Sequence, residues 1–384
     1  MRPASATDLI SPDMDPLATL QSIARRRVEE HRARLAAFGA ARVKAAMVGS
    51  FAISQLETLR MLQAERLYVV TSDTDHHSQR FCASSPEAAS DFLDRKAMET
   101  RLATDEAMVR LVPGHHAKYW LAGLAEGEVP RGILFSGDLS KRALQLSPEG
   151  IDNSHELMLE LLPDEAGELK EFARWVMGLR PAYDVLPETT GPAAKVPPPV
   201  TPTLCRLLLT KPTKTIAAHA QQLLRQARSS VTVTTWRLDE DDAFVKALAE
   251  RAGQLAVTVL APPSVDNLPA YAYLAKRGVR VLACPGMHAK LVLVDQAVSP
   301  LAMVASANFI REGMEVGVEL GLKLGSDDAR LAEVRTFVDE LISSCPPYVL
   351  TDSPKPKSLA PKGTISQQLA GLRIADRKRL HGGS

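Results

Sequence analysis

Apolar runs alternate with amphipathic stretches between positions 204 and 345, and this alternation restricts the possible fold more than any other feature of the chain. The runs are rich in Val, Thr and Leu, as in Val231–Trp236, Val257–Ala261 and Val279–Ala283. Apolar strands separated by helices are typical of an α/β lobe whose mostly parallel sheet is buried on both faces. Further strands are expected at His288–Asp295, Ala302–Ser306 and Val318–Lys323, and helices at Ile216–Arg228, Asp242–Gly253, Ala270–Arg277 and Ala329–Ser343.

The first half of the chain repeats the later part of this order more loosely. Strands are expected at Arg66–Thr71, Met108–Val112, Gly132–Ser136 and Glu156–Leu161, with a helix at Glu165–Leu179. One element order in two halves indicates an internal duplication around a pseudo-two-fold axis. We therefore predict an α/β fold of two similar lobes, each a mixed, mostly parallel sheet flanked by helices.

Composition shifts predict the boundaries of these lobes. Residues 1–45 are expected to form an N-terminal extension and helix, with a loosely attached segment at 1–20 and the helix at Ile23–Phe38. The first lobe is expected at 46–180 and the second at 204–345. They are joined by a linker at 181–203, where Pro runs can continue neither a helix nor a central strand. The basic segment 346–384 is expected to be a mobile tail, with contact to phosphates or to a protein partner as the alternative.

The overall composition excludes some classes of protein. The formal net charge is +1, so any affinity for nucleic acid must come from a local basic surface. The four cysteines form no CxxC pair, which favours a reducing compartment without a zinc cage or a disulfide framework. No apolar run has the length of a signal peptide or a membrane span, so we expect a cytoplasmic protein with no stable membrane association.

The same chemical groups recur in the same order in both halves: a His-x-Lys pair, then Ser-x-Asn or Ser-x-Asp, then Glu. The second half has His288, Lys290, Asp295, Ser306, Asn308 and Glu319, and the first half has His116, Lys118, Ser136, Asp138 and Glu156. A single His-x-Lys occurs by chance in many proteins. Two copies, each in a matching strand order, indicate a catalytic site.

These groups suit chemistry at phosphorus. Residues i and i+2 of a strand share a face, so each motif would present an imidazole beside an ammonium group. If the two strands face each other, one imidazole could attack a phosphate while the other protonates the leaving oxygen. Ser306 and Asn308 would donate hydrogen bonds to the oxyanion. Glu319 and Glu156 would each hold a histidine's second ring nitrogen.

The motif residues resemble the HxKxxxxD…SxN…E pattern of the phospholipase D superfamily over roughly residues 50–345. The first-lobe copy departs from it at three positions: Gly123 replaces Asp, Phe135 replaces Gly and Asp138 replaces Asn. In the second copy Ala305 replaces Gly, and the gap from Asp295 to Ser306 indicates a longer hairpin. A carboxylate at Asp138 would repel a phosphate unless it is protonated or turned away.

The resemblance implies a two-step reaction through a covalent phosphohistidine, with no metal and no cofactor. His116 would be the nucleophile and His288 the general acid, because the first-lobe histidine usually attacks in this family; the reverse assignment stays open. Since both motifs lie in one chain, no dimer is required, and the oligomeric state stays unknown.

The superfamily contains nucleases, enzymes that repair DNA–protein links, lipid hydrolases and phosphatidyl-transferring synthases. A chain with no membrane segment, a basic tail and only 5% aromatic residues resembles the nucleases more. Nucleic acid, most readily DNA, is therefore the expected partner, and analogy with soluble relatives suggests restriction or phage defence. The alternatives are a phospholipase or phosphatidyltransferase, and a nucleic-acid-binding subunit whose site is inactive.

Several residues near the motifs are candidates for substrate contact or for metal binding. The candidate substrate contacts are Trp120, Trp236, Arg237 and Arg311, for which core packing or simple exposure is the alternative. His115 is out of phase with Lys118 and is expected to orient its neighbour or to face solvent. The group Asp73, Asp75, His76 and His77 is expected to be a polar loop, with a metal site as the alternative.

Overall fold

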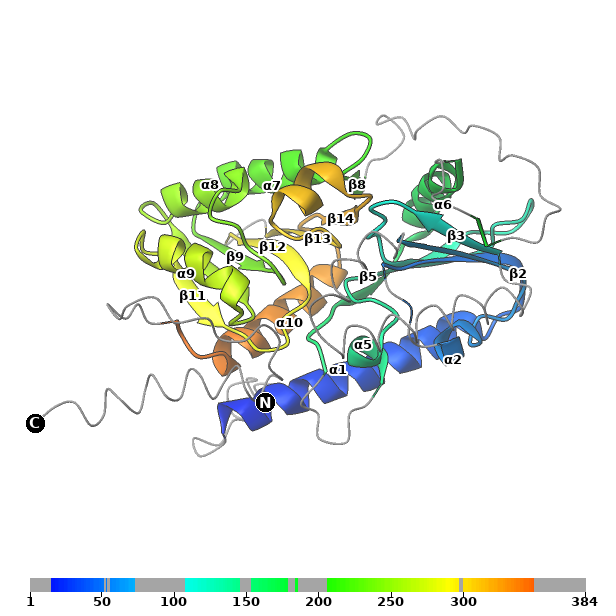
Figure 1. Cartoon of the computed structure of the whole chain (residues 1–384), viewed down its shortest axis with the longest axis horizontal. Helices are drawn as coiled ribbons and strands as arrows, with labels where there is room; N and C mark the ends of the chain where they lie inside the picture. Colours follow the sequence, from blue (N-terminus) through cyan, green and yellow to red (C-terminus); the bar gives the residue numbers. More distant parts are fainter. Residues whose placement is uncertain are drawn as a thin grey trace, which may run out of the picture.

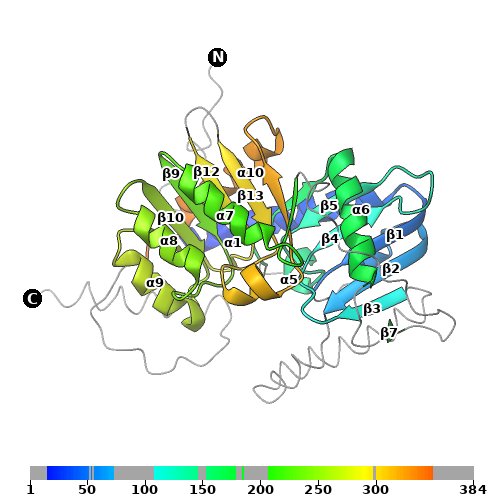
Figure 2. The same cartoon turned by 90° about the horizontal axis from the view of Figure 1, so that it is seen from above.

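The computed structural model describes residues 15–51, 53, 56–72, 108–145, 153–178, 184–185, 206–296 and 300–348. These residues form two α/β lobes that lie side by side (Figures 1 and 2). Within the described ranges, no helix is long and apolar enough to cross a membrane.

The first lobe is built on a seven-stranded sheet with the order β6-β5-β4-β1-β2-β3-β7. Its strands are β1 (Val43–Gly49), β2 (Ala64–Ser72), β3 (Met108–Val112), β4 (Tyr119–Ala122), β5 (Arg131–Phe135), β6 (Met158–Glu160) and β7 (Asp184–Val185). The helices of this half are α1 (Pro16–Gly39), α2 (Leu56–Leu59), α5 (Lys141–Leu144) and α6 (Pro163–Gly178).

The second lobe is built on a sheet with the order β11-β10-β9-β12-β13-β14-β8. Its strands are β8 (Leu207–Leu209), β9 (Ser230–Thr234), β10 (Ala256–Ala261), β11 (Arg280–Ala283), β12 (Lys290–Asp295), β13 (Leu301–Ala305) and β14 (Leu320–Leu324). Its helices are α7 (Thr215–Gln226), α8 (Ala243–Arg251), α9 (Leu268–Ala275) and α10 (Arg330–Ser344), with short helical turns at Val265–Asn267 and Glu312–Val316.

Six strands of each sheet share one order and one polarity, which confirms two similar lobes with mixed sheets. The parallel pairs β1–β2 and β2–β3 correspond to β9–β10 and β10–β11. The antiparallel strands β4, β5 and β6 correspond to β12, β13 and β14. The seventh strand lies at opposite edges, with β7 beside β3 and β8 beside β14. The pseudo-two-fold axis itself stays a prediction.

The expectation of mostly parallel sheets is wrong. Among the described strands, parallel pairing is restricted to β1, β2 and β3 in the first sheet and to β9, β10 and β11 in the second. The motif strand then enters antiparallel to the first of them, as β12 does to β9. β13 and β14 follow it in antiparallel order, and the connection between these two strands contains the helical turn Glu312–Val316. Antiparallel neighbours need no crossover helix of the kind that joins parallel strands.

Three clusters of buried apolar residues hold these layers together. The largest spans both lobes, since it contains Phe172 of α6 and Phe337 of α10 as well as Tyr119 and Leu291 from the two motif strands. A second packs α7, α8 and α9 on the outer face of the second sheet. A third packs α1 on the first sheet. Because the largest cluster is shared, burial of apolar area itself fixes one lobe against the other.

Helix α1 begins earlier than the sequence predicts. Asp15 caps it by accepting a hydrogen bond from Leu17 N–H at 3.0 Å, and Pro16 occupies the first turn. Leu20 is only 2% exposed. The expectation of a loosely attached segment is therefore wrong for residues 16–20, while residues 1–14 lie outside the described residues.

Helix α1 lies along both lobes (Figure 1) and contacts each of them. Arg27 pairs with Glu340 of α10 at 3.0 Å, and Arg34 pairs with Glu333 of the same helix at 2.7 Å. Arg34 also donates to the carbonyl of Met158 in β6 at 2.8 Å. The helix thus bridges the two lobes on the side opposite α7 and α8.

Three other predicted regions lie wholly or mainly outside the described residues. Of the Pro-rich segment 181–203, only 184–185 are described, as β7, and the basic segment is described only as far as 348. The polar group from Asp73 to His77 also lies outside them.

Candidate active site

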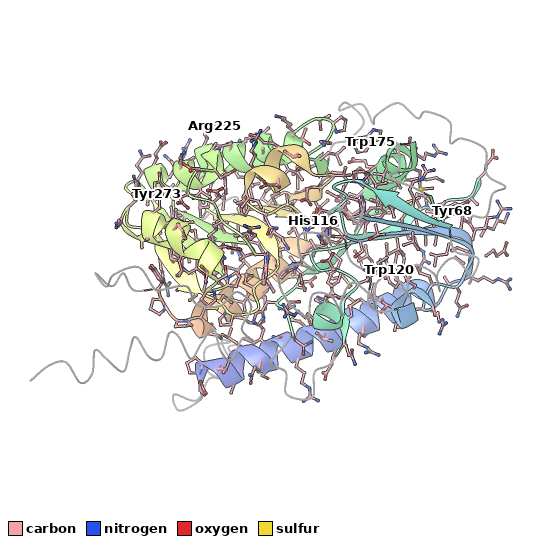
Figure 3. The ribbon with its side chains drawn as sticks, in the orientation of Figure 1. Tyr68, His116, Trp120, Trp175, Arg225 and Tyr273 are labelled. Carbon is pink, nitrogen blue, oxygen red and sulfur yellow. The ribbon has the colours of Figure 1, made fainter. Side chains whose placement is uncertain are left out.

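The two His-x-Lys motifs meet where the lobes touch, and Figure 3 shows His116 in this central position. His116 and Lys118 lie just before β4, and His288 lies just before β12, of which Lys290 is the first residue. Both motifs are held by backbone bonds to the other lobe. The N–H groups of His116 and Ala117 both donate to the carbonyl of Val318 at 2.9 Å. Those of His288 and Ala289 donate to the carbonyl of His155 at 3.2 and 2.9 Å. Val318 and His155 directly precede the two motif glutamates.

Each histidine is paired with the glutamate of the opposite lobe. His116 Nδ1 lies 2.9 Å from Glu319 Oε2, and His288 Nδ1 lies 2.8 Å from Glu156 Oε1. A carboxylate only accepts hydrogen bonds, so each Nδ1 carries the proton. In each ring Nε2 is then the nitrogen that can react with a substrate. This exchange means that neither lobe contains a complete His–Glu pair of its own.

The motif serines orient the glutamates. Ser306 Oγ donates to Glu319 Oε2 at 2.5 Å, and Ser136 Oγ donates to Glu156 Oε2 at 2.7 Å. Ser306 is fully buried and Ser136 is 1% exposed. The expectation that Ser306 binds the oxyanion is therefore wrong, because its hydroxyl proton is already used inside the protein.

The two carboxylates are held in the charged form. Burial acts to raise the pKa of Glu156, but His288, Lys290 and the hydroxyl of Ser136 together lower it to about 2. Burial also opposes ionisation of Glu319, and His116, Lys118 and Ser306 outweigh it, so its pKa is lowered as well. At neutral pH both histidines therefore face an anion.

The two lysines are buried beside the histidines. Lys118 Nζ donates to the carbonyl of His116 at 2.7 Å and lies 3.6 Å from Asp138 Oδ1. Lys290 Nζ lies 3.1 and 3.2 Å from Nδ1 and Nε2 of His288. Burial, and after it the positive charge of Lys118, lower the pKa of Lys290 to about 7. Since one lysine acts on the other across the lobes, both ammonium groups face one site.

Asp138 and Asn308 occupy equivalent positions but offer opposite groups. Thr235 Oγ1 and the N–H of Arg237 both donate to Asn308 Oδ1 at 3.3 Å, which leaves the Asn308 NH₂ group as the donor. Ser50 Oγ lies 3.5 Å from Asp138 Oδ1. Burial acts to raise the pKa of Asp138, but Lys118, both histidines and Lys290 hold it well below its usual range. Asp138 is therefore an anion inside the site, not a protonated acid.

An aromatic ring packs against each histidine. The ring of Phe51, just after β1, has its centroid 5.0 Å from that of His116. The ring of Trp236, just after β9, lies 5.5 Å from that of His288. Trp236 was a candidate from the sequence, whereas Phe51 was missed. Its signal was its position after strand β1, which the sequence analysis did not predict.

The remaining candidates lie in the core or at the surface. Trp120 is 1% exposed and packs edge-on to Phe38 in the core under α1, so it does not wall the site. Asp295 is the last residue of β12, at the other end of the strand from Lys290. It pairs with Arg335 at 2.5 Å, so its role is structural. Arg311 and Arg237 are exposed, and Arg237 pairs with Asp266 at 3.6 Å.

His115 is fully buried, so the expectation that it could face solvent is wrong. Burial, followed by Lys118, lowers its pKa to about 3, and its ring packs edge-on to Tyr119. The His115 ring is therefore a neutral, buried group that packs next to His116 and has a structural role. Among the described residues, no group of three or more His, Cys, Asp or Glu side chains could hold a metal ion.

Comparison with known proteins gives structural neighbours only. No family model matches the chain, and no curated protein matches it. The structure is similar to that of phosphatidylserine synthase from Haemophilus influenzae, with 12% identity and a TM-score of 0.56, over 92% of this chain and 93% of that one. It is also similar to polyphosphate kinase from Porphyromonas gingivalis, with 12% identity and a TM-score of 0.53, over 91% of this chain.

The chain spans about half of that kinase, 52% of its length. A third neighbour is Nuc from Salmonella typhimurium, a phospholipase D family member with 16% identity and a TM-score of 0.32, over 37% of this chain and 97% of that one. At such identities the likeness concerns the fold alone. Two mixed sheets of one order, joined so that the His-x-Lys motifs meet, characterise the architecture. The chain has the phospholipase D-like fold.

Proposed function

We propose that the protein is a phosphodiesterase that works through a phosphohistidine intermediate, with no metal and no cofactor. The observation that carries the proposal is the exchange of glutamates between the lobes. His116 and His288 each receive a carboxylate at Nδ1 from the opposite lobe. Each therefore keeps Nε2 for the reaction, and the two form one site.

The remaining groups suit a phosphodiester. The ammonium groups of Lys118 and Lys290 and the NH₂ group of Asn308 can bind non-bridging oxygens and stabilise the charge that develops on them. One histidine attacks phosphorus while the other protonates the leaving oxygen. Water then attacks the phosphohistidine, and the second histidine takes its proton.

DNA is the substrate we propose. Trp236 is half-buried beside His288, where its ring could stack on a base. Arg237 is exposed, and its N–H bonds to Asn308, so its guanidinium can reach a phosphate next to the scissile one. Neither contact requires a membrane surface.

A phospholipid is the second candidate. The phosphatidylserine synthase neighbour matches nearly the whole of both chains, which is the reason to test a phospholipid as well. At 12% identity this likeness does not extend to the substrate. A phospholipid is therefore one of the substrates in the experiment below.

The test uses purified full-length protein in EDTA with three substrates: single-stranded DNA, plasmid DNA and vesicles of phosphatidylcholine. DNA cleavage that is lost in His288→Ala supports the proposal. Release of choline or phosphatidic acid instead would assign the lipid substrate. A gel shift without cleavage, unchanged in His288→Ala, would indicate a binding subunit with an inactive site and would contradict the proposal.

A further inference from the structure

Asp138 is a carboxylate inside a site that binds an anion, and we infer that it limits the charge of the phosphate that the site accepts. A phosphodiester, with one negative charge, is favoured over a phosphomonoester or another dianion. The inference rests on the proposed function and specifies which class of phosphate the site selects. It concerns binding and leaves the roles of the two histidines open.

Asp138 occupies the place that Asn308 has in the other half. Ser50 and Thr235 follow β1 and β9 at matching positions, where their N–H groups donate to carbonyls of β2 and β10 at 3.0 and 3.1 Å. Ser50 Oγ lies 3.5 Å from Asp138 Oδ1, and Thr235 Oγ1 lies 3.3 Å from Asn308 Oδ1. The same support therefore carries a carboxylate in one half and an amide in the other.

This carboxylate balances the charge of one lysine. Lys118 Nζ lies 3.6 Å from Asp138 Oδ1, and the two side chains are 1% and 16% exposed. Water and salt screen a pair at this depth much less than a pair at the surface. Lys290 has no such carboxylate partner among the described residues, and its Nζ contacts the ring nitrogens of His288 instead. One ammonium of the two is thus left to balance a bound phosphate.

The charge of Asp138 also acts on the other half of the site. Burial, and after it Lys118, lower the pKa of Lys290, and Asp138 is one of the carboxylates that oppose this fall. Burial lowers the pKa of His288 as well, and Asp138 again acts in the opposite direction. A group that stabilises positive charge at both motifs must also oppose negative charge that is placed between them.

The charge balance of the site suits a single negative charge. Glu156 and Glu319 are each engaged by a histidine and a serine, so their charges are offset where they lie. A phosphodiester brings one negative charge, which the ammonium of Lys290 can balance. A phosphomonoester brings most of a second charge at neutral pH, and this charge meets the repulsion of Asp138 without a further cation.

The same repulsion favours release of the product. Hydrolysis of a phosphodiester leaves a phosphomonoester, which is mainly a dianion at neutral pH. Asp138 therefore destabilises the product more than the substrate. The conflict that the sequence predicts between a carboxylate at 138 and a phosphate is then a means of discrimination and does not inactivate the site.

The first test compares tungstate with perrhenate, two tetrahedral oxyanions of similar size that carry two negative charges and one. Calorimetry on the full-length protein measures both affinities. A nearby charge shifts an ionisation by about 1 to 3 pKa units, and the affinity for one added negative charge should respond by a similar factor. Asp138→Asn should therefore raise the affinity for tungstate relative to perrhenate by roughly tenfold or more. An unchanged ratio in a folded variant would overturn the inference.

Two further variants serve as controls for this ratio. Asn308→Asp places a second carboxylate at the matching position and should shift the ratio in the opposite direction. Asp241→Asn removes an exposed carboxylate that pairs with Lys246 of α8, and it should leave the ratio unchanged. Circular dichroism checks that each variant is folded. An equal shift in Asp241→Asn would show a general effect of protein charge and would contradict a specific role for Asp138.

The second test uses turnover of bis(4-nitrophenyl) phosphate with phenyl phosphate as inhibitor. Phenyl phosphate is a phosphomonoester that releases no nitrophenolate, so it does not disturb the readout. In Asp138→Asn its inhibition constant, taken relative to KM for the diester, should fall by roughly tenfold, because the inhibitor carries the additional charge. Equal relative inhibition of wild type and variant would overturn the selection of diesters.

The two tests separate the inference from the proposed function. If wild-type protein releases no nitrophenolate and cleaves neither DNA nor lipid, the proposed function fails. The calorimetric ratio needs no turnover, so it still decides whether Asp138 selects against dianions. Turnover together with an unchanged ratio in Asp138→Asn would leave the proposed function intact and remove the inference.

Discussion

Replacing Glu156 by Gln tests the exchange of glutamates between the lobes. Glutamine keeps the shape of the side chain and an acceptor oxygen for His288 Nδ1–H, and its NH₂ group can donate to Ser136. The substitution therefore removes mainly the negative charge. That charge lies 2.8 Å from a ring that carries positive charge during the reaction, either as the phosphohistidine or before it gives up its proton, and Glu156 is only 1% exposed.

The expected magnitude follows from this geometry. A hydrogen bond to a charged group contributes about 1.5–3 kcal/mol, and a tenfold rate change corresponds to about 1.4 kcal/mol. We therefore expect kcat of Glu156→Gln to fall by roughly 10- to 100-fold. KM should change little, because the lysines and Asn308 still bind the phosphate. Glu319→Gln should behave in the same way through His116.

Steady-state hydrolysis of bis(4-nitrophenyl) phosphate measures the effect, with circular dichroism to show that the fold is retained. Glu171→Gln is the control, because this glutamate is half-exposed on α6 and pairs only with Arg174 in the contacts seen. A folded Glu156→Gln that keeps more than half of the wild-type kcat would refute the reasoning.

Three further predictions concern the histidines, metals and pH. His116→Ala and His288→Ala should each reduce turnover by several orders of magnitude, and the double variant should be no worse than the weaker single one; additive losses would indicate two independent sites. Activity should persist in EDTA, since the lysines supply the positive charge, and a strict requirement for Mg²⁺ would contradict this. Inhibition by tungstate should weaken as pH rises above about 7, because the charged form of Lys290 is lost there; Lys290→Arg should remove this dependence, and its persistence would exclude Lys290 as the cause.

Much of the fold could be predicted because buried strands have a strong local pattern. The second-lobe strands β9, β10 and β11 were each predicted with limits within two residues of those observed. Strand β1, with the sequence VKAAMVG, was missed because three of its seven residues are Ala or Gly, which favour no strand. Phe51, which follows it, was missed for the same reason.

The composition of the site was more predictable than its contacts. The motifs identify which groups take part, but the docking of one lobe on the other decides which glutamate holds which histidine. Trp120 shows a related limit. The alternation rule assumed a strand through Lys118, but β4 begins only at Tyr119, and Trp120 turns into the core. Ser306 was assigned to the phosphate because sequence order does not show how close its hydroxyl lies to Glu319.

A crystal structure with tungstate is the most direct test of a single shared site. One ion per chain should lie between the imidazoles of His116 and His288, with an oxygen of the ion close to Lys290 and another close to Asn308. Two ions, one at each His-x-Lys motif and each contacting a single histidine, would contradict the account.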